Sequence, residues 1–487
     1  MKIRSSGVSR RQVLKTTIGT TAGAAAYSLG LGGRAPAYAQ GNATTIRVLS
    51  VEDPFFFALR DVIGDFTDQT GIDVELESLS YDAMQARLVT SFVSNTSDAD
   101  VVTVDQMWTG QYIDNGWIRP LDEFAAGDAD LDITDFMPEV LYSLNTWRGH
   151  LATLPVAAYA QGVMYRRSVA DQLGLDIPDA TGSWTWDAYT DTIAAMNGQN
   201  VNGTDMFGTV ICGSQPTPIV HMFTQAAASY GARWFADFPA SPEWDFTPTI
   251  NSPEMMAAVD QYARLYDLSP PEAINYLWFD AGTRFSTGDI GMFYWWTPYF
   301  YLIKNNGYMT GEPSVVADDY GIAPLPVAGS TPQVISLGGW SFGIPSTTEK
   351  ADAAWEFLKW STSAATQKAM GLVDTYNYQF SDFARRSLYN DSDLTAIYPY
   401  LGTQAGMLAQ GNGKIARPPA PVYTTLEGIM GLELNKVLIG QQSAEEALST
   451  MDDLFLNTLR GNFLIPYSLP SFDDTPEATV ELINRLA

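Results

Sequence analysis

The sequence feature that most constrains the fold is an alternation of strand and helix patterns between residues 45 and 105. Runs rich in apolar and β-branched residues predict three strands, at 45–51, 72–76 and 100–104. Apolar residues at helical spacing predict helices between them, over 61–69 and 81–93. Because parallel neighbours in a sheet need a crossover of about this length, the alternation predicts a parallel α/β sheet.

Acidic and aromatic side chains directly follow these three strands. Ligands of parallel sheets bind beyond the carboxyl ends of the strands. Carboxylates hydrogen-bond to sugar hydroxyls, and aromatic rings pack on the apolar C–H faces of a sugar. We therefore expect the strand ends to contribute five ligand-binding residues: Glu52, Asp53, Tyr81, Asp105 and Trp108. Helix capping by the acids and core packing by the rings are equally consistent with these positions.

A second α/β region follows from about residue 154. Its elements are a predicted strand at 162–165, a helix at 186–196 begun by Thr185, a strand at 336–344, a helix at 348–361, and a helical stretch at 423–459 broken at Gly440. The Pro- and Trp-rich stretch 238–253 predicts irregular surface structure. The 487 residues predict about two to four domains.

The first 39 residues predict an export signal. Arg10 and Arg11 precede a weakly apolar run of Thr, Gly and Ala, and the run ends in Ala37-Tyr38-Ala39, a small-x-small cleavage site. This pattern resembles the twin-arginine signals that export folded proteins. Glycines interrupt the run, which disfavours a membrane anchor. We expect a mature protein that begins near Gln40 in a bacterial periplasm.

Composition excludes several classes of partner and site. The chain has 27 Lys and Arg against 55 Asp and Glu, a net charge of −28, which makes nucleic-acid and membrane-surface partners unfavourable. One cysteine and two histidines cannot form an internal disulfide or a Cys/His zinc cage. We therefore expect no metal and no cofactor.

Gly339-Trp340-Ser341-Phe342-Gly343 fits the nucleophile elbow of α/β-hydrolases. An elbow requires an immediate helix and a histidine after the serine, whereas Pro345 follows here and both histidines precede Ser341. An esterase is therefore disfavoured. A glycosidase needs only two carboxylates at a suitable separation, and 55 acidic residues leave that alternative open.

Short stretches in order along nearly the whole mature chain match one known family. They are FTDQTGIDV at 66–74, DVV at 100–102, GWIRPLDE at 116–123, LPV at 154–156, MYRRS at 164–168, WTWDAY at 184–189, FSTGDIGMF at 285–293, YGIAPLP at 320–326, GGWSFGIP at 338–345 and AAWEFL at 353–358. In these stretches the chain resembles the extracellular solute-binding proteins of ABC sugar importers, the maltose-binding-protein-like family.

The resemblance implies a two-lobed α/β fold. Each lobe would hold a mostly parallel sheet flanked by helices, with hinge crossings between the lobes and a sugar in the cleft. We expect residues 40–156 and 334–385 to form lobe 1, and 157–333 and 386–487 to form lobe 2. The chain departs from the family at 374–380, where a Pro-containing loop is usual.

Further ligand-binding residues are expected on other segments: Tyr159, Trp295, Trp296, Gly339, Trp340, Tyr376 and Arg417. Adjacent Trp295 and Trp296 point to opposite sides of an extended chain, so one could stack on the ligand while the other packs in the core. Gly339 allows the backbone beside Trp340 to approach a ligand closely.

The predicted function is a periplasmic substrate-binding component of an ABC transporter. It would capture a sugar or polyol by hinge closure, deliver it to membrane permease subunits, act as a monomer and catalyse no reaction. The alternatives are a secreted carbohydrate-active enzyme with paired carboxylates, and a binder of peptides or carboxylates. The second alternative requires a cationic pocket, for which Arg417 is the one base placed at the site.

Overall fold

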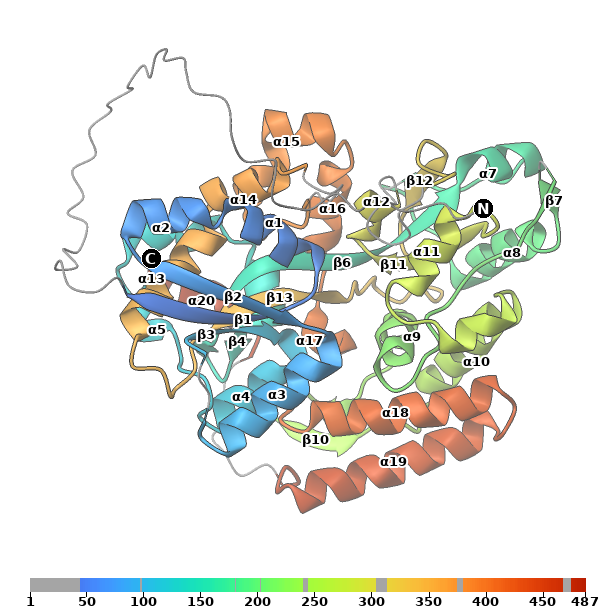
Figure 1. Cartoon of the computed structure of the whole chain (residues 1–487). Helices are drawn as coiled ribbons and strands as arrows, with labels where there is room; N and C mark the ends of the chain where they lie inside the picture. Colours follow the sequence, from blue (N-terminus) through green and yellow to red (C-terminus); the bar gives the residue numbers. More distant parts are fainter. Residues whose placement is uncertain are drawn as a thin grey trace, which may run out of the picture. The chain divides into compact units, whose positions relative to one another are not determined.

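A seven-stranded mixed sheet organises the computed structural model (Figure 1). The spatial order is β11 (Met292–Trp296), β6 (Leu154–Arg166), β13 (Leu337–Gly343), β3 (Val101–Asp105), β1 (Thr45–Val51) and β2 (Asp73–Leu79), with β12 (Tyr320–Ala323) also paired to β6. The structure describes residues 44–96, 99–179, 181–201, 203–239, 244–303, 313–374, 380–466 and 474–487. The predicted export signal at 1–39 lies outside these residues.

The first part of the sheet is parallel, as the strand–helix alternation predicts. β1 pairs in parallel with β2 and with β3. α3 (Tyr81–Val93) has the predicted bounds, and Gly71, with φ of +72°, ends α2 (Gly64–Thr70). The structure adds α1 (Pro54–Val62), which the sequence analysis missed because its first residues are apolar on every side and show no helical period.

The pairs of β6 differ from the predicted parallel arrangement. β11, β12 and β13 all run antiparallel to β6, and β13 is also antiparallel to β3. The 13-residue β6 pairs with β13 along its first half and with β11 and β12 along its second half. Strand–helix alternation produces parallel pairs only when every strand begins at the same edge of the sheet. β11, β12 and β13 begin at the edge opposite to the one where β6 begins, so they pair with β6 in the antiparallel direction.

The helices of the second part confirm most of the predicted elements. Thr185 caps α8 (Trp186–Met196) by accepting from the backbone N–H of Ala188, and α13 (Ala351–Thr362) follows β13. α18 (Tyr423–Leu438) and α19 (Ala444–Gly461) pack side by side, with Gly440 at φ of +70° between them (Figure 1). The stretch predicted to be irregular contains β10 (Asp245–Pro248), paired with β9 (Phe235–Asp237).

The other elements complete the layers around the sheet. The helices are α4 (Thr109–Asp114), α5 (Asp122–Ala125), α6 (Pro138–Val140), α7 (Arg167–Leu173), α9 (Thr217–Ser229), α10 (Pro253–Asp267), α11 (Asp280–Ser286), α12 (Tyr299–Leu302), α14 (Ala364–Gly371), α15 (Ser392–Ile397), α16 (Leu401–Leu408), α17 (Gly413–Ala416) and α20 (Pro476–Leu486). Two short pairs are β4 (Thr146–Trp147) with β5 (His150–Leu151), and β7 (Asn200–Val201) with β8 (Thr204–Asp205). Within the described ranges, no helix combines the length and apolarity needed to cross a bilayer.

β13 fixes the position of one predicted site residue. Trp340 lies opposite Asp105 of β3 and Ala157 of β6, and the register with β6 shifts directly after Trp340. Gly339 has φ of +124°, and a Cβ added there would lie 2.1 Å from the carbonyl oxygen of Ala157. The strand therefore requires glycine immediately before Trp340.

Gly339→Ala is expected to lower the free energy of unfolding by about 3 kcal/mol, because it combines backbone strain with a clash against Ala157. Chemical denaturation of the purified protein measures this loss. Gly406→Ala in α16 is the matched control, since a Cβ there meets nothing within 4 Å. We expect that variant to be neutral or more stable by up to about 1 kcal/mol. Equal stabilities of the two variants would contradict the role assigned to Gly339.

Candidate functional site

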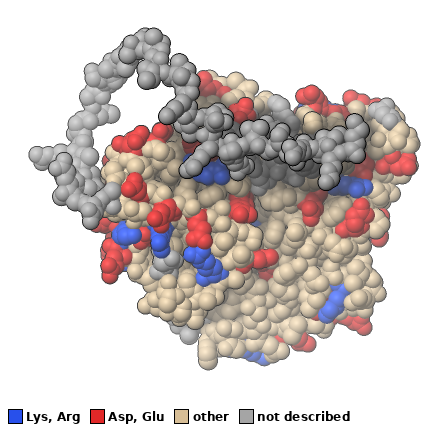
Figure 2. Space-filling view, viewed as in Figure 1, with Lys and Arg blue, Asp and Glu red and all other residues tan. Residues whose placement is uncertain are grey.

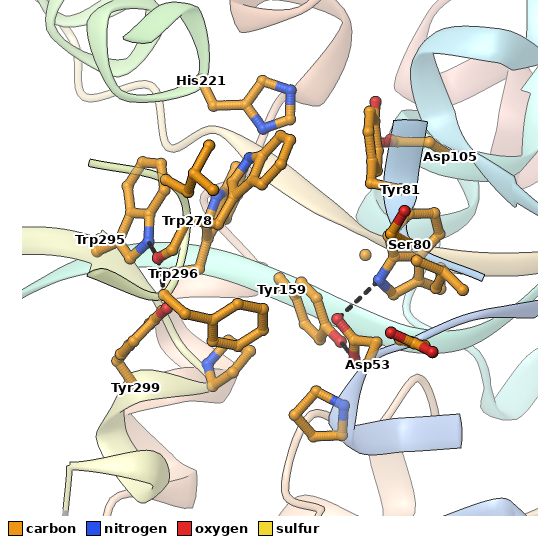
Figure 3. Close-up of a pocket in the computed structure, with 18 of the residues that line it drawn as sticks. Asp53, Ser80, Tyr81, Asp105, Tyr159, His221, Trp278, Trp295, Trp296 and Tyr299 are labelled. Carbon is orange, nitrogen blue, oxygen red and sulfur yellow. Dashed lines mark hydrogen bonds between the residues drawn. The ribbon is translucent and has the colours of Figure 1, made fainter. Parts of the chain in front are cut away.

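A cavity of about 600 Å³ lies at the carboxyl ends of β1, β2 and β3. Figure 3 shows Trp295, Trp296 and Tyr299 on one side of the cavity, Ser80, Tyr81 and Asp105 on the other, and Tyr159 between them. The lining residues are Val51, Glu52, Asp53, Pro54, Phe57, Ser80, Tyr81, Asp82, Asp105, Tyr159, His221, Leu277, Trp278, Phe279, Asp280, Trp295, Trp296, Pro298, Tyr299, Gly339, Trp340 and Arg417.

The structure brings together all but two of the residues predicted to bind ligand. Those that line the cavity are Glu52, Asp53, Tyr81, Asp105, Tyr159, Trp295, Trp296, Gly339, Trp340 and Arg417. Trp108 does not, because its side chain is completely buried against the rings of Tyr81 and Trp340. It is a core residue, as the packing alternative allows. Tyr376 lies outside the described residues. Contact of these side chains with a ligand stays a prediction.

Asp53 joins the end of β1 to two other strands. Its Oδ1 accepts from the Tyr159 hydroxyl of β6 at 2.5 Å. The same oxygen accepts from the backbone N–H of Phe55, so that Asp53 caps the N-terminus of α1. Its Oδ2 accepts from the indole N–H of Trp340 at 3.1 Å. Burial raises the pKa of Asp53 to about 6, although these hydrogen bonds favour the charged form. Asp53 is thus a helix cap and a cavity-lining residue at once.

Asp105 is a second buried carboxylate, 4% exposed, at the end of β3. Its Oδ2 accepts from the Tyr81 hydroxyl at 3.2 Å. Its Oδ1 has no hydrogen-bond partner within normal distance among the described residues. Burial raises the pKa of Asp105, while the positive charge of Arg417 and the nearby backbone N–H groups act in the opposite direction. This oxygen is buried behind the cavity surface.

Arg417 is the buried cation of the site. Its guanidinium lies 4.8 Å from the ring centroid of Trp296, Nη2 donates to the carbonyl of Leu337 at 3.0 Å, and Nη1 donates to His221 Nε2 at 3.3 Å. Nε makes no hydrogen bond with a described residue. The Gln106 side chain ties this segment to the end of β3 by donating to the carbonyl of Arg417.

His221 and Glu427 lie beside Arg417. Glu427 Oε1 is 3.2 Å from His221 Nε2 and accepts from the Tyr423 hydroxyl. Burial and the charge of Arg417 lower the pKa of His221 well below its usual value, so the imidazole is neutral at pH 7. Burial raises the pKa of Glu427 well above its usual value. The charge of Arg417 opposes this rise, as it does for Asp105.

The opposite wall consists of rings whose polar tips are hydrogen-bonded to the backbone. The Trp295 indole N–H donates to the carbonyl of Trp278 at 3.0 Å, and the Tyr299 hydroxyl donates to the same carbonyl. Trp295 and Trp296 are both lining residues; the side chain of Trp295 is completely buried, and Trp296 is 7% exposed. The ring of Trp278 lies 5.0 Å from that of Tyr81 and connects the two walls.

Several lining residues were not predicted from the sequence: Phe57, Ser80, Asp82, His221, Leu277, Trp278, Phe279, Asp280 and Tyr299. His221 lies on α9, a helix buried on every face, where no pattern separates it from the core. The aromatic run around Trp278 lies between two regular elements, and exposed aromatic residues in a loop are a usable signal. Asp82 follows Tyr81 and could have been named with it.

Comparison with known proteins identifies relatives along most of the chain. The family model for bacterial extracellular solute-binding proteins matches residues 56–368, more than half of the chain. A probable amino-acid ABC transporter periplasmic-binding protein of Sinorhizobium fredii is 24% identical, over 83% of this chain and 87% of the relative. A mannitol-binding protein of Pseudomonas aeruginosa is also 24% identical, over 85% of this chain and 92% of the relative.

A solved structure supports the same family. The ABC transporter solute-binding protein of Agrobacterium radiobacter K84, in complex with ribitol, superimposes with a TM-score of 0.74 at 28% identity, covering 85% of this chain and 98% of that one. The likeness confirms the predicted α/β fold of a periplasmic binding protein. The relatives are binding components of transporters, so the comparisons favour the binding function and not the carbohydrate-active enzyme. The chain belongs to the bacterial extracellular solute-binding protein family.

Proposed function

We propose that this protein captures a sugar or polyol in the cavity beside β1, β2 and β3 and delivers it to the permease of an ABC importer. The observation that carries the proposal is the meeting of carboxylates and aromatic rings from distant segments around one cavity. The mannitol and ribitol named for two relatives are molecules that such a lining suits. A carboxylate ligand is less suited, because five carboxylates line the cavity and Arg417 is the only Lys or Arg among its described lining residues.

The lining can account for useful affinity. Covering about 100 Å² of apolar sugar face contributes roughly 2.5 kcal/mol. Each net hydrogen bond adds about 1 kcal/mol. A micromolar complex requires about 8 kcal/mol. Two covered faces and about three hydrogen bonds supply roughly 8 kcal/mol before the cost of association, so further hydrogen bonds to the carboxylates must offset that cost.

The same proposal includes the lobes and the location. Residues 40–156 with 334–385, and 157–333 with 386–487, form the two lobes that close on the ligand. The segment 1–39 directs twin-arginine export to the periplasm and is cleaved near Ala39. The acidic surface, on which Asp and Glu lie among fewer Lys and Arg (Figure 2), suits a monomer that binds no nucleic acid.

A thermal-shift screen of the mature chain against mono-, di- and trisaccharides and polyols tests the function. A true ligand at 100 times its Kd adds about 2.7 kcal/mol of stability. Trp278→Ala is expected to weaken the best ligand about tenfold, because it removes roughly 60 Å² of stacking surface, about 1.5 kcal/mol.

The matched control for this test is Trp117→Ala. Trp117 is also half-buried among rings, against Phe92 and Tyr112, but it does not line the cavity. Its loss should lower the melting temperature and leave the ligand affinity unchanged. The absence of any stabilising sugar or polyol would refute the function, and equal affinities of the two variants would refute the site.

The pKa of Asp53 predicts a pH dependence of binding. Sugar hydroxyls donate to the ionised carboxylate, so binding lowers its pKa below the value of about 6 that burial gives the free protein. Affinity should be constant above pH 7 and fall below pH 6, by up to about tenfold per pH unit, as the carboxylate takes up a proton. Isothermal titration calorimetry between pH 5 and 8 measures this slope. Asp53→Asn should remove it, and a pH-independent wild type would contradict hydrogen bonding to the ionised group.

A further inference from the structure

We propose that the preferred ligand carries an ammonium group on its polyhydroxy skeleton, as an amino sugar or an amino alditol does. This inference rests on the proposed function, since it assumes a sugar or polyol in the same cavity. It concerns which chemical class of polyol the lining selects. The balance of hydrogen-bond donors, acceptors and charges around the cavity determines this selection.

Many of the donors that face the cavity are already hydrogen-bonded within the protein. Five lining aromatic residues use their hydroxyl or indole N–H in this way: Tyr81, Tyr159, Trp295, Tyr299 and Trp340. Both Nη atoms of Arg417 donate to other groups of the protein. These residues therefore present to a ligand the faces of their rings, and few of their donors.

The acceptors of the cavity are carboxylates in excess. Asp105 is a lining residue, and its Oδ1 is buried without a hydrogen-bond partner at normal distance among the described residues. Glu52, Asp82 and Asp280 add three carboxylates to the lining. Against these acids and Asp53, Arg417 is the only Lys or Arg among the described lining residues. An occupant of this space meets net negative charge.

An ammonium group matches this balance better than a hydroxyl. It donates up to three hydrogen bonds and needs no donor in return, whereas each hydroxyl also offers two acceptor lone pairs. Charge-assisted hydrogen bonds to a carboxylate are about twice as strong as neutral ones. The ring of Tyr81, whose hydroxyl donates to Asp105, adds cation–π attraction close to that carboxylate. The geometry places the ammonium group at Asp105.

Matched ligand pairs test the inference by calorimetry at pH 7. The pairs are glucose and glucosamine, galactose and galactosamine, and glucitol and 1-amino-1-deoxyglucitol, with N-acetylglucosamine as the uncharged amide. In at least one pair the amine should bind ten times more tightly than the hydroxyl compound and the amide. In Asp105→Asn that preference should shrink at least fivefold, with circular dichroism as the check on folding.

Asp68→Asn is the charge-matched control, because Asp68 is exposed on α2 and does not line the cavity. It should keep the preference. Glu52→Gln, which alters an exposed lining carboxylate, should reduce the preference even if Asp105→Asn fails to fold. Neutral members that bind as tightly as their amines in every pair would overturn this inference and leave the proposed function standing. A preference that survives in both Asp105→Asn and Glu52→Gln would also overturn it, and no binding by any compound would overturn both.

Discussion

Two carboxylates buried at the carboxyl edge of a parallel sheet determine how the cavity is built. A buried carboxylate is stable only when other groups donate hydrogen bonds to it. Asp53 obtains these from Tyr159 on β6 and Trp340 on β13, and Asp105 obtains one from Tyr81 at the start of α3. These hydrogen bonds hold rings from separate segments around one space. The need to satisfy two acids therefore also places Tyr81, Tyr159 and Trp340 in the lining.

The same constraint explains the electrostatics of the site. Arg417 lines the cavity beside a neutral His221, and its positive charge opposes the rise in pKa that burial causes in Asp105 and Glu427. Burial raises the pKa of Asp382 to about 8, and the charge of Asp53 acts in the same direction. The cavity thus has strong acceptors and apolar faces, which is the chemistry of a binding protein for polyhydroxy ligands.

The part of the site that lies at strand ends could be predicted from the sequence, because it depends only on the succession of strands and helices along a short stretch of the chain. Three strands in parallel place their last residues at one edge, and this rule found Glu52, Asp53, Tyr81 and Asp105. The same rule wrongly selected Trp108, whose ring is buried in the core. Strand order predicts where the backbone lies, but it does not predict in which direction a side chain points. The antiparallel pairs of β6 were missed because strand direction there depends on one long shared strand.

The second wall could be predicted only in part. Trp295 and Trp296 stand out as an aromatic pair at the end of a strand, but Trp278 and His221 reach the cavity through a loop and a fully buried helix. Their positions depend on how segments far apart in sequence pack together. That packing leaves no periodic signal in the chain.

A crystal structure of the mature protein with its tightest sugar or polyol tests the central claim most directly. The account predicts ligand density between Tyr81 and Trp340 on one side and Trp295, Trp296 and Tyr299 on the other, with a polar ligand atom in hydrogen-bond contact with Asp105 Oδ1. Ligand density at another surface, with only solvent in this cavity, would contradict it.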